Sequence, residues 1–184
     1  PRHGDLLNDT YLVVDLPNIW SPIYTETVLD DDGAEITNNF PFEFRWIKNI
    51  GSSLIEEVSI YADGTKLQSY SGQYLRNMVE RDFEKCKKEL FYKMIGHSPQ
   101  LYDPARTTNN GQYPNASNPT QPSQTSQTPN PSINRQTLYI PLNSWFSLST
   151  YQSLPLISTQ YNNIIIKIRI RPLRDLYVVK DLET

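Results

Sequence analysis

The chain has 184 residues, a net charge of −3 at pH 7 and an isoelectric point of about 5.4. This length suits one domain with a sizeable core, and the acidic balance argues against a general phosphate-binding surface, which would need clustered Lys and Arg. The single cysteine, Cys86, excludes an intrachain disulfide and a cysteine-based zinc site, while 12 Tyr and 14 Pro favour an all-β protein with long loops.

The first predicted strand covers residues 9–16, in which hydrophobic side chains alternate. One face of this strand carries Leu12, Val14 and Leu16. Pro17 ends the strand because proline has no backbone N–H to donate. We expect a loop over residues 18–40. We interpret its acidic run at 30–33 as a turn, since Val28 stands where an EF-hand would need a calcium ligand.

Two further segments predict strands of a sheet. Residues 41–48 place aromatic side chains on one face, namely Phe42, Phe44 and Trp46. Residues 53–61 place aliphatic side chains together, namely Leu54, Val58 and Ile60. Asp63 and Gly64 supply the positive φ angles of a tight hairpin turn, so a return strand is expected from Lys66.

Residues 73–95 predict one inserted amphipathic helix. Its hydrophobic residues recur every three or four positions: Leu75, Met78, Val79, Phe83, Cys86 and Leu90. Acids interleave with bases on the other face, which favours a solvated surface over a nucleic-acid contact for the lysines at 85–88. We expect Cys86 to pack on the apolar face and Gly96 to end the helix.

Residues 97–136 predict a long polar loop. The part from Thr107 to Pro131 has almost no aliphatic side chain, so it cannot bury enough apolar surface to offset its ordering entropy. A loop of this length within a domain is either functional or disordered. Asn115 begins an Asn-Ala-Ser sequon and is a candidate glycosylation site.

The last predicted strands cover residues 137–142 and 163–171. The first places three aliphatic residues on one face: Leu138, Ile140 and Leu142. The second has a face of four isoleucines, Ile164, Ile166, Ile168 and Ile170, expected to fill the core, and a basic face with Lys167, Arg169 and Arg171. We interpret the basic face as pairing with acids of a neighbouring strand or subunit. Residues 175–180 predict a further strand or a linker.

Patterns of catalytic or metal-binding residues are absent from the sequence. His3 and His97 stand in no metal-ligand spacing, and no nucleophile elbow or phosphate-binding glycine loop occurs. Glu56 and Glu57 are adjacent in a predicted strand, so they are expected to point to opposite faces and not to act as a glycosidase pair. We predict that the protein is not an enzyme and needs no cofactor or metal.

The segment 139–161 carries an ordered set of motifs: Pro-Leu, Trp-Phe, Leu-Pro-Leu-Ile and Gln-Tyr. Their residues are Pro141, Leu142, Trp145, Phe146, Leu154, Pro155, Leu156, Ile157, Gln160 and Tyr161. This order resembles that of the major capsid proteins of the nucleocytoplasmic large DNA viruses. The opening Arg2, Gly4 and Asp5, and the segment 92–96, are similar to the family too. Ser147–Ser149 replaces the family's basic turn, as in a divergent member.

Composition and alternation predict only a β-rich chain with one helix. The resemblance implies a more specific fold. It implies an all-β sandwich of the viral jelly-roll type. Residues 1–184 would form a single jelly-roll domain, the N-terminal one of two expected in the full protein. The polar loop at 97–136 would form the outward-facing top of the capsomer.

The resemblance also implies a structural function, as a major capsid protein whose trimeric, pseudo-hexagonal capsomers tile an icosahedral shell. Trp145 and Phe146 would then anchor a loop to the sheet. Implied partners are further copies, penton and minor capsid proteins and an inner membrane, with no direct nucleic-acid contact, in a virion assembled in the host cytoplasm. The alternative is a β-sandwich carbohydrate- or receptor-binding module, in which Trp145 and Phe146 would stack on sugars.

Overall fold

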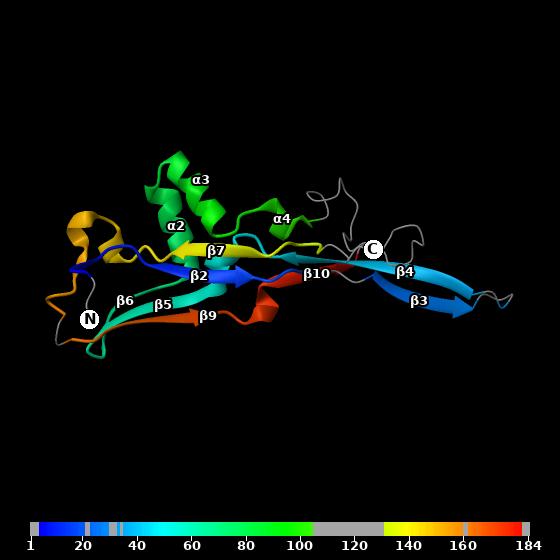
Figure 1. Cartoon of the computed structure of the whole chain (residues 1–184), viewed down its shortest axis with the longest axis horizontal. Helices are drawn as coiled ribbons and strands as arrows, with labels where there is room; N and C mark the ends of the chain where they lie inside the picture. The colour runs from blue at the N-terminus through cyan, green and yellow to red at the C-terminus, as the bar shows by residue number, and fades with distance from the viewer. Residues whose placement is uncertain are drawn as a thin grey trace. The chain divides into compact units, whose positions relative to one another are not determined.

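The computed structural model describes residues 4–20, 23–29, 33, 35–104, 131–159 and 162–181 (Figure 1). Strands paired into sheets predominate among them. The chain forms two compact units. Unit 1 comprises residues 1–14, 48–97 and 137–176, and unit 2 comprises residues 15–47, 98–136 and 177–184. That residues 1–184 form a single domain stays a prediction.

The first sheet of unit 1 contains two strands, β2 (Tyr11–Leu16) and β7 (Gln136–Pro141). The alternation predicted for both strands is confirmed. On β7, Leu138 and Ile140 are fully buried. On the predicted hydrophobic face of β2, Leu12 and Val14 are only half-buried.

The second sheet of unit 1 has the order β6–β5–β9, with β5 (Ile55–Ala62) antiparallel to β6 (Thr65–Tyr70) and to β9 (Ile164–Ile170). Asp63 and Gly64 have positive φ angles of 46° and 81°, which confirms the predicted hairpin turn. Leu54, predicted in a strand, ends the short helix α1 (Ile50–Leu54) instead.

The isoleucine face of β9 does not fill the core as predicted. Its members Ile164, Ile166 and Ile168 are half-buried, and Ile170 is 54% exposed. The reason is the position of β9 in the sheet, since among the described residues it pairs with β5 alone and is an edge strand.

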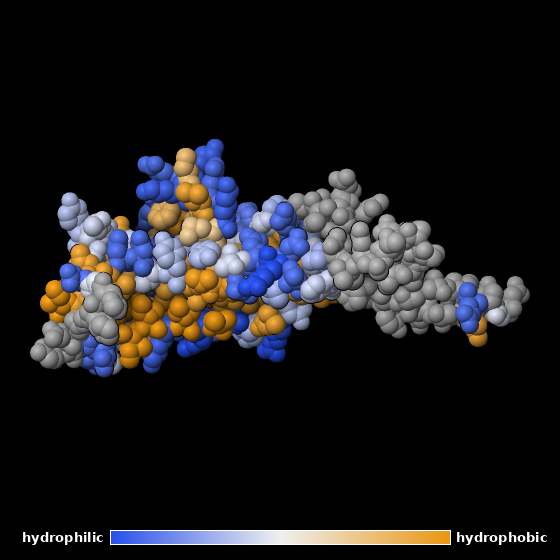
Figure 2. Space-filling view, in the orientation of Figure 1, coloured by the Kyte–Doolittle hydropathy of each residue, from blue (hydrophilic) through white to orange (hydrophobic). Residues whose placement is uncertain are grey.

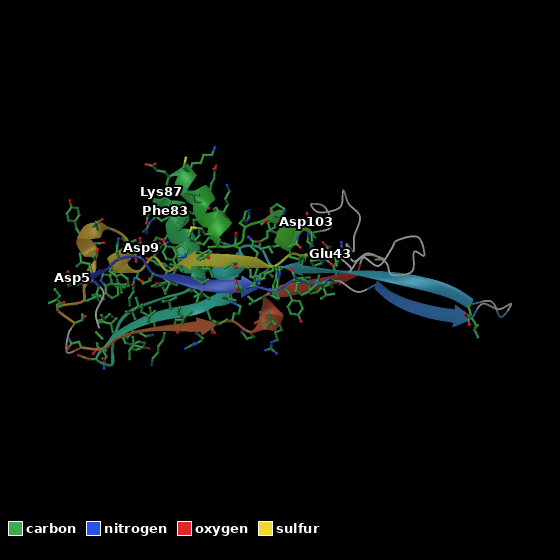
Figure 3. The ribbon with its side chains drawn as sticks, in the orientation of Figure 1. Asp5, Asp9, Glu43, Phe83, Lys87 and Asp103 are labelled. Carbon is green, nitrogen blue, oxygen red and sulfur yellow. The ribbon has the colours of Figure 1, made fainter. Side chains whose placement is uncertain are left out.

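The single helix predicted over 73–95 is wrong, because two helices occupy that range: α2 (Gly72–Asp82) and α3 (Lys85–Met94). Phe83 and Glu84 between them have extended backbone, with ψ angles of 143° and 159°, and Phe83 is seen at this break in Figure 3. The break resets the helical phase. Consequently Phe91 is the buried residue of α3, and Cys86 and Leu90, predicted to be packed, are exposed.

The predicted stop at Gly96 is confirmed. Gly96 has a φ of 78°, and its N–H donates to the carbonyl of Lys93 at 3.2 Å while that of His97 donates to the carbonyl of Tyr92 at 2.8 Å. These two bonds form a Schellman motif, which requires the left-handed backbone that glycine adopts without strain.

Unit 2 contains the sheet β10–β4–β3, formed by β3 (Ile23–Leu29), β4 (Glu35–Trp46) and β10 (Tyr177–Asp181). The loop predicted over 18–40 is therefore wrong, because β3 and β4 form an antiparallel hairpin there. The β-branched residues in IYTETVL support a strand, and the polar side chains between them hid the alternation. The acidic residues at 30–32 and the side chain of Phe42 lie outside the described residues.

Short elements complete the two units. In unit 1, β1 (Leu6–Leu7) pairs with β8 (Leu154–Pro155), and three 3₁₀ turns cover Trp145–Ser147, Thr150–Gln152 and Leu173–Asp175. In unit 2, the helix α4 (Pro99–Tyr102) lies inside the range predicted as a polar loop. The remainder of that loop, from 105 to 130, lies outside the described residues, as does the candidate glycosylation site Asn115.

Candidate functional site

The motif segment begins where β7 leaves its sheet. Pro141 is the last residue of β7, and Leu142 is buried, with its N–H donating to the carbonyl of Thr10 at 3.0 Å. The hydroxyl of Ser147 donates to the carbonyl of Asn8 at 2.6 Å. The segment is thus held to the residues just before β2.

A buried tyrosine anchors the loop that follows β7 to the second sheet. The hydroxyl of Tyr70, at the end of β6, donates to the carbonyl of Leu142 at 2.7 Å and lies 3.1 Å from the Oγ of Ser144. Burial raises the pKa of the Tyr70 phenol, so it stays a neutral donor. The partner of Tyr70, 72 residues away, could not be read from the sequence.

The Trp-Phe pair lies against the β6–β5–β9 sheet. Phe146 is fully buried, and Trp145 is half-buried with its ring perpendicular to that of Phe146 at a centroid distance of 5.1 Å. The backbone N–H of Trp145 donates to the side-chain carbonyl of Gln68 on β6 at 3.4 Å. The pair therefore packs onto the sheet and does not form an open sugar-stacking platform.

The Leu-Pro-Leu-Ile motif lies against the start of the described chain. In β8, Leu154 faces Leu7 and Pro155 faces Leu6. The N–H of Leu156 donates to the carbonyl of Asp5 at 2.8 Å, and Asp5 is labelled at this end of unit 1 in Figure 3. Two segments that resemble the same family are thus adjacent in space.

The remaining motif residues are less constrained by this unit. Ile157 is 64% exposed. Gln160, Tyr161 and Arg2 lie outside the described residues. The structural role of the motif as a whole stays a prediction.

The outer face of the β6–β5–β9 sheet carries a polar cluster centred on Glu57. Its carboxylate accepts hydrogen bonds from the hydroxyls of Ser69 and Ser59 and from the ammonium of Lys66, the last two at 2.9 Å and 3.0 Å. The guanidinium of Arg169 lies 3.2 Å away. The hydrogen bond from Ser69, followed by those from Lys66 and Ser59, lowers the pKa of Glu57 to about 2.

The prediction that Glu56 and Glu57 point apart is wrong. The pairing of β5 with β9 shifts register between Ile55 and Glu57, so Glu56 is the extra residue of a β-bulge. The bulge turns its carboxylate to within 3.7 Å of Arg169, the same guanidinium that Glu57 contacts. Both acids therefore form one ion-pair cluster on the sheet.

The basic face of β9 is engaged within the unit. Arg169 pairs with these acids of the neighbouring strand, as predicted. Lys167 lies over the ring of Tyr61, 4.8 Å from its centroid, in cation–π geometry. The guanidinium of Arg171 donates to the carbonyl of Ser53 at 3.1 Å. These contacts occupy the cations that a phosphate would need.

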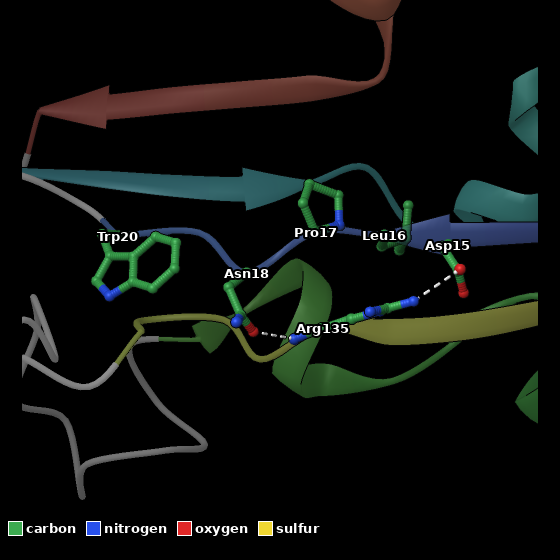
Figure 4. A pocket seen from close by; sticks show the side chains of 6 residues that line it. All are labelled: Asp15, Leu16, Pro17, Asn18, Trp20 and Arg135. Carbon is green, nitrogen blue, oxygen red and sulfur yellow. Dashed lines mark hydrogen bonds and ion pairs between the residues drawn. The ribbon is translucent and has the colours of Figure 1, made fainter.

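A shallow pocket of about 400 Å³ lies in unit 2, lined by Asp15, Leu16, Pro17, Asn18, Trp20 and Arg135 (Figure 4). The guanidinium of Arg135 contacts the carboxylate of Asp15 at 2.9 Å, and its backbone N–H donates to the side-chain carbonyl of Asn18 at 2.5 Å. Trp20 is 52% exposed. The exposed indole gives this pocket an apolar surface beside polar groups. Sequence analysis missed this site because Arg135 lies 120 positions from Asp15.

Metal-binding clusters of three or more His, Cys, Asp or Glu residues do not occur among the described residues. Within the same part of the chain, no helix combines the length and the apolar character needed to cross a lipid bilayer.

Comparison with known proteins places this geometry in context. Residues 1–184 match the family model described as major capsid protein N-terminus. The chain is 27% identical over 180 residues to the major capsid protein of Frog virus 3 (isolate Goorha), covering 98% of this chain and 33% of that protein. It is also 27% identical over 180 residues to capsid protein 1 of Acanthamoeba polyphaga mimivirus, covering 98% and 26%. The chain thus spans about a quarter to a third of the curated relatives it matches.

Among solved structures, the chain is similar to the Faustovirus major capsid protein. The TM-score is 0.65 at 16% sequence identity, and the similarity covers 96% of this chain and 39% of that chain. At this identity the likeness concerns the fold.

Proposed function

This chain belongs to the major capsid protein N-terminus family, and on this premise we propose that it is the N-terminal jelly-roll domain of a viral major capsid protein. The single observation that carries the proposal is the family match over the whole of residues 1–184. The fold likeness to the Faustovirus major capsid protein supports it. In this function the domain supplies shape and contacts, not chemistry.

We propose that the full protein forms trimers with a pseudo-hexagonal outline, built from two jelly rolls in each chain, and that these capsomers tile an icosahedral shell. A closed trimer repeats the same heterologous contact three times, so each chain must hold two complementary surfaces in a fixed relation. Rigidity in unit 1 comes from long-range anchors such as the bond from Tyr70 to Leu142. The buried Phe146 fixes the same loop.

The proposed partners follow from this assembly. They are further copies of the chain, penton proteins and minor capsid proteins, with an inner membrane beneath the shell and assembly in the host cytoplasm. Direct nucleic-acid binding is not part of the proposal, because the cations of β9 are already engaged by Glu57, Tyr61 and the chain near Ser53.

The experiment that tests this function measures the mass of the full-length protein by light scattering on a sizing column, followed by negative-stain imaging. We expect a stable trimer with a hexagonal outline. A protein that stays monomeric at high concentration would overturn the proposal. The same mass measurement is made on Phe146→Ala, which removes a buried anchor. Leu148→Ala, at a 56% exposed position two residues away, is its matched control.

A second candidate function is carbohydrate binding, which the exposed indole of the unit 2 pocket favours. Binding of glycans to the full-length protein is measured on an array and repeated with Trp20→Ala. A sugar-binding pocket requires saturable binding that Trp20→Ala weakens at least about tenfold. Equal signals from the two proteins would eliminate this pocket as the site.

A further inference from the structure

The exposed side of α3 carries a hydrophobic residue between two lysines. Leu90 is 60% exposed. On a helix the nearest surface neighbours of a residue are those three and four positions away, which for Leu90 are Cys86, Lys87, Lys93 and the half-buried Met94. Figure 2 shows hydrophobic residues among hydrophilic ones over the helices that Figure 1 labels α2 and α3. We call Cys86, Lys87, Leu90 and Lys93 the basic face of α3, since its charges are all positive.

The two lysines of the basic face are not neutralised by the described residues. Lys88, which reaches α2, contacts the carboxylate of Glu80 at 3.1 Å. Lys87 and Lys93 are exposed and have no ion-pair partner in the part of the chain that the structure describes. Adjacent residues of a helix are about 100° apart around its axis, so the acid Glu89 lies at the flank of this face. The face thus presents uncompensated positive charge around an apolar centre.

A surface of the opposite character lies at the end of unit 1 where β1 pairs with β8. Leu6 is 59% exposed and Ile157 is 64% exposed. Their segments adjoin, because Leu6 faces Pro155 across the two strands and the main chain next to Ile157 is bonded to that of Asp5. Asp5 and Asp9 are exposed on either side of Leu6 in the sequence. We call Asp5, Leu6, Asp9 and Ile157 the acidic patch.

The charges of the acidic patch are uncompensated too. Residues 4–14 and 141–159, which include this end of unit 1, contain Asp5 and Asp9 as their only charged side chains. Neither carboxylate has an ion-pair partner among the residues that the structure describes. Figure 3 labels both acids at this end and Lys87 on α3. The acidic patch and the basic face therefore carry opposite charges around apolar centres, and no ion pair joins them within the described chain.

We propose that the basic face of α3 docks on the acidic patch of a second copy of this chain. The two lysines would pair with Asp5 and Asp9, while Leu90 would cover the exposed aliphatic side chains of the patch. Because the two surfaces differ, the contact is heterologous, and such contacts close into rings or continue as an array. The inference rests on the proposed function, in which copies of the chain surround one another in the capsomer and in the shell.

A nucleic acid or an anionic membrane fits these observations less well. Either would engage the basic face alone and leave the acidic patch without a role, and Glu89 at the flank would repel either one. The chain as a whole has a net charge of −3, which opposes attraction to a polyanion. A second copy supplies both members of the complementary pair, and complementary charges fix the register of a protein–protein contact.

The test is charge reversal in the full-length protein, with sedimentation velocity as the measure of assembly. One variant combines Lys87→Glu with Lys93→Glu, and another combines Asp5→Lys with Asp9→Lys. We expect each to raise the protein concentration needed for assembly by about tenfold or more, because like charges then meet across the contact. Since all four side chains are exposed and unpaired among the described residues, the Tm of the monomeric chain should not change.

The combination of all four reversals restores opposite charges across the contact. We expect its assembly to recover to within about threefold of that of the unsubstituted protein. Lys85→Glu, at an exposed position of α3 outside the basic face, is the matched control and should assemble normally. The contact is refuted if the combined variant assembles no better than either pair, or if both pairs assemble like Lys85→Glu. Weakening by the lysine pair alone would assign α3 to another anionic partner and refute it as well.

These outcomes separate the contact from the proposed function. An unsubstituted protein that stays monomeric would overturn both, whereas normal trimers and arrays from the reversed variants would overturn the contact alone.

Zero-length crosslinking locates the contact directly. A carbodiimide joins a lysine amine to a carboxylate only where the two groups touch, and it is applied to assembled full-length protein made from ¹⁴N- and ¹⁵N-labelled chains. We expect crosslinked peptides that join α3 to the segment 4–14 and carry mixed isotope labels, which mark two chains. Crosslinks with a single label only would place the contact within one chain and refute the proposal.

Discussion

Substitution of Gly72 by alanine is expected to destabilise the protein, against the usual effect of this change in a helix. Gly72 is the first residue of α2, after the N-cap Ser71. Alanine in place of glycine normally stabilises a helix by up to about 1 kcal/mol. Here a Cβ atom at position 72 would lie 1.8 Å from the carbonyl oxygen of Ser52 and 2.8 Å from that of Ile55.

The magnitude follows from what has to move. Real Cβ contacts essentially never fall below 3.0 Å, so the Ser52 carbonyl must shift by about 1.2 Å relative to α2. This oxygen belongs to the backbone of α1 and cannot rotate away as a side chain would. Overpacking costs about 1–3 kcal/mol and occasionally more, and a backbone clash belongs at the upper end. After subtracting the gain in helix propensity, we expect the free energy of unfolding to fall by about 2 kcal/mol or more.

Thermal unfolding of the full-length protein, followed by circular dichroism, measures this loss. For a chain of 184 residues, a loss of about 2 kcal/mol lowers Tm by about 4–8 °C. Gly4→Ala is the matched control, because nothing lies within 4 Å of a Cβ at that position, and its Tm should be unchanged. If Gly72→Ala were as stable as Gly4→Ala or the unsubstituted protein, the close packing of α1 against α2 would be refuted.

Three further substitutions test the anchors and the polar cluster. Tyr70→Phe removes the donor to a buried carbonyl and should cost about 1–3 kcal/mol in urea unfolding, whereas Tyr151→Phe, at a fully exposed position, should cost nothing measurable. Phe146→Ala empties a fully buried site and should cost about 3–5 kcal/mol in the same assay; a loss below about 1 kcal/mol would contradict its burial. Because the folded-state pKa of Glu57 is about 2 and the unfolded value about 4.5, its stabilisation is present above the unfolded pKa and is lost as pH falls from about 4.5 to 2. Glu57→Gln should therefore flatten the dependence of the unfolding free energy on pH over that window, and an unchanged pH dependence would argue against the cluster.

Period-2 alternation was sufficient to predict most strands of unit 1. In β7 the hydrophobic residues fall on one face without interruption, and that face is the buried one. The hairpin at Asp63–Gly64 was equally accessible, because both residues adopt the positive φ angles that their types favour. Local chemistry decides these features, so sequence suffices for them.

The misassigned segments depend on information that is not local. In α2 and α3 the hydrophobic spacing runs on through Phe83, and only the extended backbone there separates the helices and exposes Cys86. In β5 a bulge at Glu56, set by pairing with a strand more than a hundred residues away, rotates the side chain. Long-range register decides both the bulge and the partner of Tyr70, and periodicity within one segment does not contain it.

The motif residues fall into a buried group and an exposed group. Leu142 and Phe146 are buried and hold the loop after β7 in place, so packing within unit 1 is a sufficient reason for their types. Pro155 and Ile157 are exposed, and packing in this unit gives no reason for an isoleucine that is 64% exposed. An exposed apolar residue next to a rigid anchor is well placed for a contact between chains. We therefore expect Ile157→Asp to weaken the proposed trimer or the contacts between capsomers. The Tm of the monomeric chain should be unchanged. If assembly were unaltered, those contacts would have to lie elsewhere.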